Sequence, residues 1–180
     1  MLTSAQVREE IERAERRFVE VCASATEKQW QFQPSGSGDR AWTMPQVVEH
    51  VTTGNQGVLL MMQSVVVSSP RGDQMPEFDD EDMPYIFYGG GGAPPPGLPE
   101  PSGAWTQDQG IVAFQESMLA LLQWYDALDI DLRECAVAHP AFGLFDGAQW
   151  MLFQAVHAQQ HRGQLLDLKR ASDEAKAAVV

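Results

Sequence analysis

Four short stretches of this chain match the sequence pattern of a helix N-terminus. Each has Thr or Asp followed three residues later by Gln, at Thr3 and Gln6, Thr43 and Gln46, Thr106 and Gln109, and Asp146 and Gln149. In such a capping box the first side chain accepts a hydrogen bond from a backbone N–H of the first turn, and the Gln side chain bonds back to the cap residue. A segment with an apolar period near 3.6 follows each pattern, and no segment alternates like a strand for long. The chain is therefore expected to form four helices.

These helices are predicted at about Thr3–Ser24, Met44–Ser68, Gln107–Leu128 and Gly147–Ala171. Helices of about 20 to 25 residues are about 30–38 Å long at 1.5 Å per residue, so they can pack side by side around one core. The predicted fold class is all-α, and the predicted architecture is a four-helix bundle.

The connection between the second and third predicted helices, residues 69–105, is much longer than the other two. It contains an acidic run at 77–82 and a Gly/Pro-rich run at 89–96. Neither composition supports a helix, and the acidic run is expected to be a solvated loop. A connection of this length can cross the whole bundle and make the two helices parallel. The predicted topology is up-down-down-up, with a long crossover between helices 2 and 3.

The length and the charge bound the number of domains and the kinds of partner. The 180 residues fit one domain, predicted at 1–172 with a C-terminal tail at 173–180. Asp and Glu number 25 against 12 Lys and Arg, a formal charge of −13, which repels phosphate backbones and anionic lipids. A small-molecule substrate is therefore expected, without nucleic acid or membrane as partner. A homodimer along an exposed helix pair is compatible with such a bundle.

The expected location is the cytoplasm. No apolar stretch reaches the roughly 18 residues of a membrane span, and the N-terminal residues lack the apolar core of a signal peptide. Cys22 and Cys135 form no disulfide framework, and both thiols are expected to be inert.

Three of the four histidines interrupt the apolar stripes of predicted helices. His157 and His161 are four residues apart, so their Cβ atoms lie about 5–6 Å apart on one helix face and both imidazoles can reach one metal. His50 interrupts the stripe of the helix predicted at 44–68. Buried imidazoles need partners, and neutral imidazole is the commonest metal ligand among side chains.

The predicted topology brings these three histidines to nearly one level. By the helical rise, His50 lies about 10 Å from the start of its helix, and the other two lie about 14–20 Å from the end of theirs. The spacing therefore favours a three-His metal site over core histidines that are satisfied by hydrogen bonds. His139 lies in the connection at 129–145, at the opposite end of this topology, and is expected to be a structural loop residue.

The stretches around these histidines resemble a known family. Residues 42–51 (WTMPQVVEHV), 139–150 and 153–164 are similar to the DinB/YfiT-like four-helix bundles. The resemblance implies that His50, His157 and His161 hold a divalent metal, zinc or nickel first. The donor chemistry of three imidazoles with an open position also suits iron or manganese. It also implies an enzyme similar to thiol S-transferases, whose metal activates a low-molecular-weight thiol, such as mycothiol, bacillithiol or glutathione, for attack on a small electrophile.

Two alternatives to the transferase stay open. Three nitrogen ligands leave an open position, which is typical of catalytic rather than structural sites. Water in that position would make the protein a metal-dependent hydrolase, whereas a site without turnover would make it a metal-binding or small-molecule-binding stress module. Thiol-dependent turnover and metal analysis distinguish these alternatives.

Four aromatic residues are expected near the bundle end where the second and third helices begin: Trp30, Phe32, Trp42 and Trp105. Aromatic walls beside a metal suit an apolar or conjugated substrate, so these residues are predicted to line the substrate pocket. The alternative is that they only close the end of the bundle. Glu49 and Gln164 are close in sequence to the histidines, but spacing assigns neither to a ligand ring, and no further catalytic residue is predicted.

Overall fold

The computed structural model describes residues 1–35, 41–66, 76, 78–87 and 100–177. Its long helices are α1 (Ser4–Ala23), α3 (Met44–Met61), α4 (Gln107–Asp126) and α5 (Gly147–Ala177). The short elements are the helix α2 (Glu27–Trp30), the π turn η2 (Met62–Val66), the 3₁₀ turns η3 (Met83–Tyr85) and η4 (Leu132–Glu134), and the strands β1 (Ala136–His139) and β2 (Gly143–Asp146). The predicted helical class is confirmed. The Gly/Pro-rich run at 89–96 lies outside the described residues.

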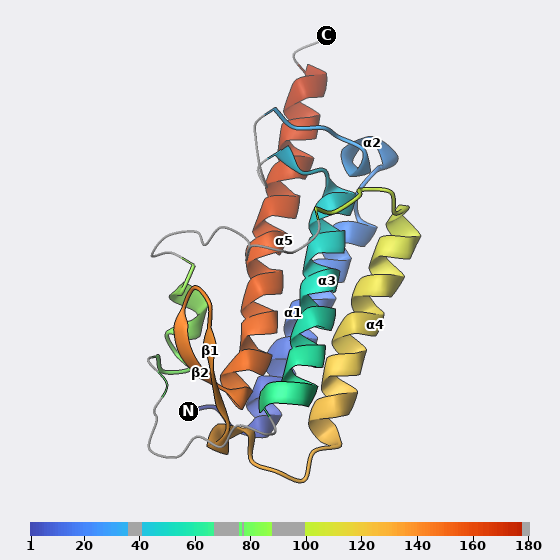
Figure 1. Ribbon diagram of the computed structural model, residues 1–180. Coiled ribbons are helices and arrows are strands. Elements are labelled where there is room, and N and C mark those ends of the chain that lie inside the picture. Colours follow the sequence, from blue (N-terminus) through green and yellow to red (C-terminus); the bar gives the residue numbers. More distant parts are fainter. Residues whose placement is uncertain (36–40, 67–75, 77, 88–99, 178–180) are drawn as a thin grey trace.

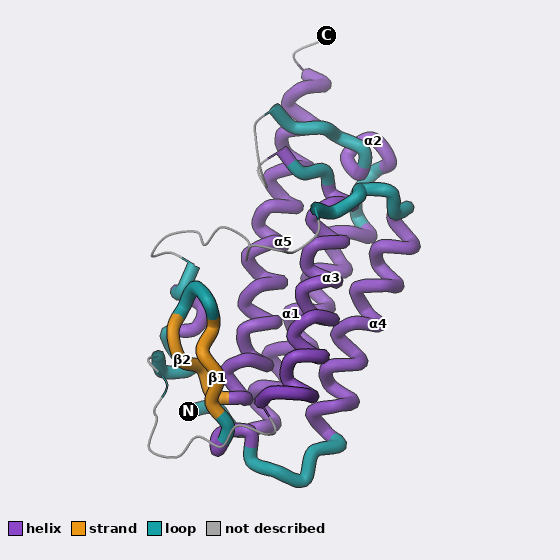
Figure 2. The backbone as a smooth tube through the Cα atoms, in the orientation of Figure 1, coloured by secondary structure: helices purple, strands orange, loops and turns teal. Residues whose placement is uncertain are grey.

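The four long helices lie side by side (Figure 1). Helix α1 packs against α5 and α4, while α3 packs against α4 and α5. In Figure 1, α1 and α5 run upward and α3 and α4 run downward, so the two helices that carry the histidine cluster are antiparallel neighbours. Figure 2 shows the small hairpin beside the lower part of α5. Within the described residues, no helix is both long and apolar enough to cross a membrane.

Each of the four predicted capping boxes begins a long helix. The Gln side-chain oxygen accepts a bond from the backbone N–H of the cap residue at 2.9 Å for Thr3, 2.9 Å for Thr43, 3.0 Å for Thr106 and 3.1 Å for Asp146. A fifth box, Thr26 with Gln29, begins α2. The sequence pattern does not predict this helix, because four residues are too few to show an apolar period.

Two helix ends differ from the prediction. Helix α3 ends at Met61 and continues as the π turn η2, whereas α5 continues to Ala177. Residues 173–177 of the predicted tail are thus helical. The additional turns of α5 have packing partners, since Ser172 is buried and the Gln29 side chain of α2 donates to Asp173 at 3.1 Å.

A β-hairpin occupies most of the connection at 129–145, where the sequence analysis expected no strands. Ala136 pairs with Asp146 and His139 pairs with Gly143, antiparallel. Gly143 has a φ of +84°, which glycine adopts without the strain that a Cβ would cause. Strands of four residues are too short to show a clear alternation, and this is why the prediction missed them.

The acidic run at 77–82 was predicted to be a solvated loop, and Asp79, Glu81 and Asp82 are indeed exposed, but Asp80 is buried, so the prediction is wrong for that residue. Arg133 donates to its two carboxylate oxygens at 2.9 and 2.7 Å and to Asp146 at 3.0 Å. Asp146 also accepts from the Gln149 backbone N–H at 2.8 Å and thereby caps α5. The backbone N–H of Leu2 donates to Asp80 as well. This ion cluster ties the N-terminus, the acidic loop and η4 to the start of α5.

The core between the helices is apolar and aromatic. The ring of Phe18 on α1 stacks on Phe114 of α4, with 4.2 Å between the centroids. Trp30 is fully buried at the end where α3 and α4 begin, and its indole N–H donates to the backbone oxygen of Trp105 at 3.1 Å. Gly110 leaves room for this indole, because a Cβ there would lie 3.3 Å from the ring. Tight packing of this kind fixes the relative heights of the helices, and so the level of the histidines.

Candidate metal centre

The three predicted ligand histidines lie together in the structure. His50 comes from α3, while His157 and His161 come from successive turns of α5. One ring nitrogen from each histidine lies within 4.8 Å of the corresponding nitrogens of the other two. The ring centroids are 5.2 Å apart for His50 and His157, 4.9 Å for His50 and His161, and 4.6 Å for His157 and His161. The ring planes are steeply inclined to one another, by 68° to 83°, so the three imidazoles meet at their edges.

This donor set fits a divalent transition metal. Nitrogens that bind zinc at 2.0–2.1 Å in tetrahedral geometry are about 3.4 Å apart, so small side-chain rotations would close the observed cluster around an ion. Three imidazoles suit zinc and nickel, and also iron or manganese. A set of three leaves at least one position for another ligand, which structural zinc sites do not.

Gln164 fixes the orientation of one ring. Its side-chain oxygen lies 2.8 Å from Nδ1 of His161. Because an amide oxygen only accepts, this contact favours the tautomer with the proton on Nδ1 and the lone pair of His161 on Nε2. Glu49 has a different partner in the structure, since its carboxylate accepts bonds from the Ser102 hydroxyl at 2.8 Å and the Gly103 backbone N–H at 3.0 Å. It thus anchors the end of the long connection beside His50.

A comparison with protein-family models matches residues 10–165 to the DinB superfamily. The chain belongs to the DinB superfamily. The match includes α3 and α5 with all three histidines, and it confirms the family resemblance of the stretches around them. A comparison with curated proteins found no match. Within this DinB-superfamily chain, the family and the geometry agree on a three-His cluster that is compatible with metal binding.

Small and aromatic residues surround the cluster. A Cβ on Gly54 of α3 would lie 3.5 Å from Cε1 of His157, an ordinary van der Waals distance, so the imidazole packs close to the α3 backbone at this glycine. On α5 the Phe153 ring lies parallel to His157, with centroids 5.7 Å apart and 8° between the planes. Phe87, from the loop after η3, stacks near the same imidazole at 6.3 Å. The spacing of four residues places Phe153 on the same face as His157, but nothing in the sequence signals Phe87.

The electrostatics favour neutral imidazole at this site. Removal from water lowers the pKa of His157 well below its ordinary value of 6.5, and the neighbouring His161, His50 and His139 lower it further. A neutral ring offers a free nitrogen lone pair, which is the form that a metal requires.

His139 is nearer to the cluster than the predicted topology placed it. The hairpin folds back along α5, so His139 is a buried strand residue whose ring lies 4.8 Å from Phe153, and Phe153 in turn stacks on His157. The predicted topology placed His139 at the opposite end of the bundle, because the hairpin formed by the connection was not predicted. Its Nδ1 accepts the Ala141 backbone N–H at 3.1 Å, and it is not one of the three clustered histidines.

The four aromatic residues predicted to line a pocket lie in different surroundings. The ring centroids of Trp42 and His50 are 4.9 Å apart. Among the described residues, Trp42 is the one of these four aromatic residues whose ring contacts a histidine of the cluster. Trp30 is fully buried in the core, while Phe32 and Trp105 are partly exposed. The predicted pocket stays a prediction, whereas the aromatic contacts with His157 come from Phe87 and Phe153, which it did not include.

Proposed function

We propose that this protein is a metal-dependent thiol S-transferase built as an up-down-down-up four-helix bundle. In this proposal His50, His157 and His161 bind zinc or nickel, with iron or manganese as further candidates, and a low-molecular-weight thiol is the co-substrate. The observation that carries the proposal is the convergence of three imidazole nitrogens within 4.8 Å from two neighbouring helices. The directions of the long helices in Figure 1 support the bundle topology.

When bound, the metal would supply a positive charge that favours the thiolate form of a coordinated thiol. Because the three imidazoles are neutral, they leave that charge in place, whereas a carboxylate ligand would reduce it. The net reaction joins the thiol sulfur to an electrophilic carbon. In a substitution the thiol proton is released together with the leaving group, whereas in an addition it ends on the product. The rings of Phe87 and Phe153 cover His157 and present an apolar surface beside the site.

The proposal includes a cytoplasmic location and excludes the protein's own thiols from the reaction. Cys22 and Cys135 are free and buried. Burial raises the pKa of Cys22 to about 12, and burial with nearby carboxylates raises that of Cys135. Both therefore stay protonated at neutral pH, and the reacting sulfur must come from a co-substrate.

Metal-loaded protein tests this function directly. Zinc-loaded and nickel-loaded protein would be assayed for the reaction of glutathione and other small thiols with an aryl halide. The same assay would be made on His161→Ala, which removes a histidine of the cluster, and on His139→Phe, a control outside the cluster. We expect thiol-dependent turnover that His161→Ala abolishes and His139→Phe retains. Turnover of a hydrolysable substrate without thiol would instead identify a hydrolase. Binding of metal without any turnover would leave a binding module.

A further inference from the structure

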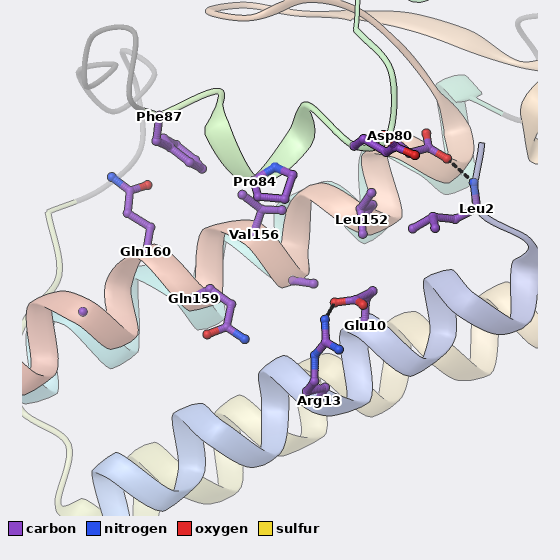
Figure 3. Close-up of a pocket in the computed structure, with 13 residues that line it drawn as sticks. Leu2, Glu10, Arg13, Asp80, Pro84, Phe87, Leu152, Val156, Gln159 and Gln160 are labelled. Atoms are coloured by element: carbon purple, nitrogen blue, oxygen red, sulfur yellow. Dashed lines mark hydrogen bonds and ion pairs between the residues drawn. The ribbon is translucent and has the colours of Figure 1, made fainter.

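A groove of about 700 Å³ lies between α5, α1 and the loop that contains η3 (Figure 3). Its floor is apolar and its edge carries amide and charged groups. The lining side chains from α5 are Leu152, Ala155, Val156, Gln159, Gln160 and Gly163, and those from elsewhere are Leu2, Glu10, Arg13, Asp80, Glu81, Pro84 and Phe87. The volume falls within the range of about 300–1,000 Å³ that is usual for small-molecule sites.

The groove and the histidine cluster occupy opposite faces of α5. Successive residues of an α-helix are turned by about 100°, so Ala155 and Gln159, two residues before and after His157, are each turned by about 200° from it. Both line the groove. A molecule in the groove is thus separated from the ligand nitrogens by the helix itself, and the groove is a second site.

Phe87 is the one wall that the groove shares with the surroundings of the metal centre. Its ring lines the groove and also lies 6.3 Å from His157 and 5.6 Å from Phe153. Figure 3 shows Phe87 and Pro84 on the loop above α5, facing Val156 and Gln160. An apolar molecule between these side chains would be covered on two sides, which favours a flat or elongated apolar body.

The polar edge indicates the charge of the occupant. Carboxylates of Glu10, Asp80 and Glu81 line the groove together with the guanidinium of Arg13, and Arg133 pairs with Asp80 and with the neighbouring Asp146. Arg13 already pairs with Glu10, so its charge is compensated without a ligand. An anion would meet an excess of negative charge here, whereas the amides of Gln159 and Gln160 can donate to and accept from neutral polar groups.

We propose that this groove binds an uncharged small molecule that has an apolar body and a hydrogen-bonding end. The apolar body would lie on Leu152, Ala155 and Val156, with the polar end towards Gln159 and Gln160. This site needs no metal, so it goes beyond the proposed transferase and does not depend on it.

The test is a fluorescence titration with Nile red, an uncharged dye with a flat apolar body, and with the anionic dye anilinonaphthalene sulfonate for comparison. The groove variant is Gly163→Trp and its matched control is Gly57→Trp. Both glycines are exposed within helices, and a Cβ at either position would meet no neighbouring side chain within 4 Å, so both substitutions leave the core untouched. The indole at 163 would occupy one end of the groove, while that at 57 lies on α3, away from it.

We expect one Nile red molecule to bind per chain, about equally with chelator and with zinc. Gly163→Trp should weaken this binding at least about tenfold, since it fills space that the dye needs, and Gly57→Trp should leave it unchanged. Amide chemical shifts should change at Val156 and Phe87 when the dye is added. Failure of Nile red to bind, or equal weakening by both variants, would overturn the proposal.

Two further outcomes test where the dye binds and which charge the ligand has. Dye binding that disappears with chelator or with His161→Ala would place the dye at the histidine cluster, which overturns the groove as a site and leaves the transferase proposal intact. Binding of the anionic dye as tight as that of Nile red would overturn the assignment of an uncharged ligand.

Discussion

The side-chain oxygen of Gln164 lies 2.8 Å from Nδ1 of His161, one helical turn away on α5. This contact favours the tautomer whose lone pair is on Nε2, and it restrains the ring against rotation. The orientation of the imidazole is therefore set by the protein before any ion binds.

Replacement of Gln164 should weaken metal binding without removing a ligand. We expect Gln164→Leu to raise the dissociation constant for zinc about 10–100-fold, the usual effect of losing a hydrogen-bond partner of a metal-bound histidine. Gln164→Glu should keep the affinity, because a carboxylate accepts the same bond and makes the ring more basic. Competition with a chromophoric chelator measures both. Equal affinities for wild type and Gln164→Leu would show that the contact does not orient the ligand.

Metal removal should lower the thermal stability. A ligand that binds only the folded state at about 100 times its dissociation constant adds about 2.7 kcal/mol. For a chain of this size each kcal/mol shifts the melting temperature by about 2–4 °C, so zinc should raise it by about 5–10 °C above the chelated protein. Because His161→Ala removes one of the three donors, it should abolish most of this difference. A melting temperature that ignores chelator would contradict metal binding by the cluster.

The ion cluster of Asp80, Arg133 and Asp146 should be essential for stability. The Asp80 and Asp146 side chains are each 1% exposed and that of Arg133 is 15% exposed. We expect Arg133→Met to cost about 3–5 kcal/mol, because it leaves two carboxylates buried without their partner. Chemical denaturation measures the loss of unfolding free energy.

Arg170→Met provides the matched control for this prediction. Arg170 pairs with Asp167 on α5, but these two side chains are 69% and 72% exposed. Solvent screens such a pair, so its loss should cost less than about 1 kcal/mol. Similar losses of unfolding free energy for Arg133→Met and Arg170→Met would show that the buried ion cluster contributes no more to stability than an exposed pair.

Local sequence signals predicted the helices and the histidines that cluster between them. A capping box such as Thr3 with Gln6 spans four residues, and His157 and His161 lie one helical turn apart, so short-range patterns contain the information. The pairing of His50 with the other two needed only the helix directions as a further assumption.

The features that the sequence did not predict depend on residues far apart in the chain. Asp80 and Arg133 are separated by 53 positions, and nothing near either residue indicates the other. Phe87 reaches His157 from a loop, and His139 approaches Phe153 because a hairpin of two short strands folds back along α5. Tertiary contacts decide these positions, and a periodicity within one segment cannot report them.

Burial of His139 should make the protein acid-sensitive independently of the metal. Burial lowers the pKa of His139 from 6.5 to about 4. The unfolded chain then binds a proton more readily than the folded one, so stability is full above pH 6.5 and declines as the pH falls towards 4. The shift corresponds to about 3 kcal/mol. When the pH falls from 7 to 4 in excess chelator, the unfolding free energy of both proteins should fall. The fall should be about 3 kcal/mol smaller for His139→Phe than for wild type, because phenylalanine fits the same aromatic surroundings without titrating. Parallel pH profiles for the two proteins, measured by urea denaturation, would show that His139 is not buried as a neutral ring.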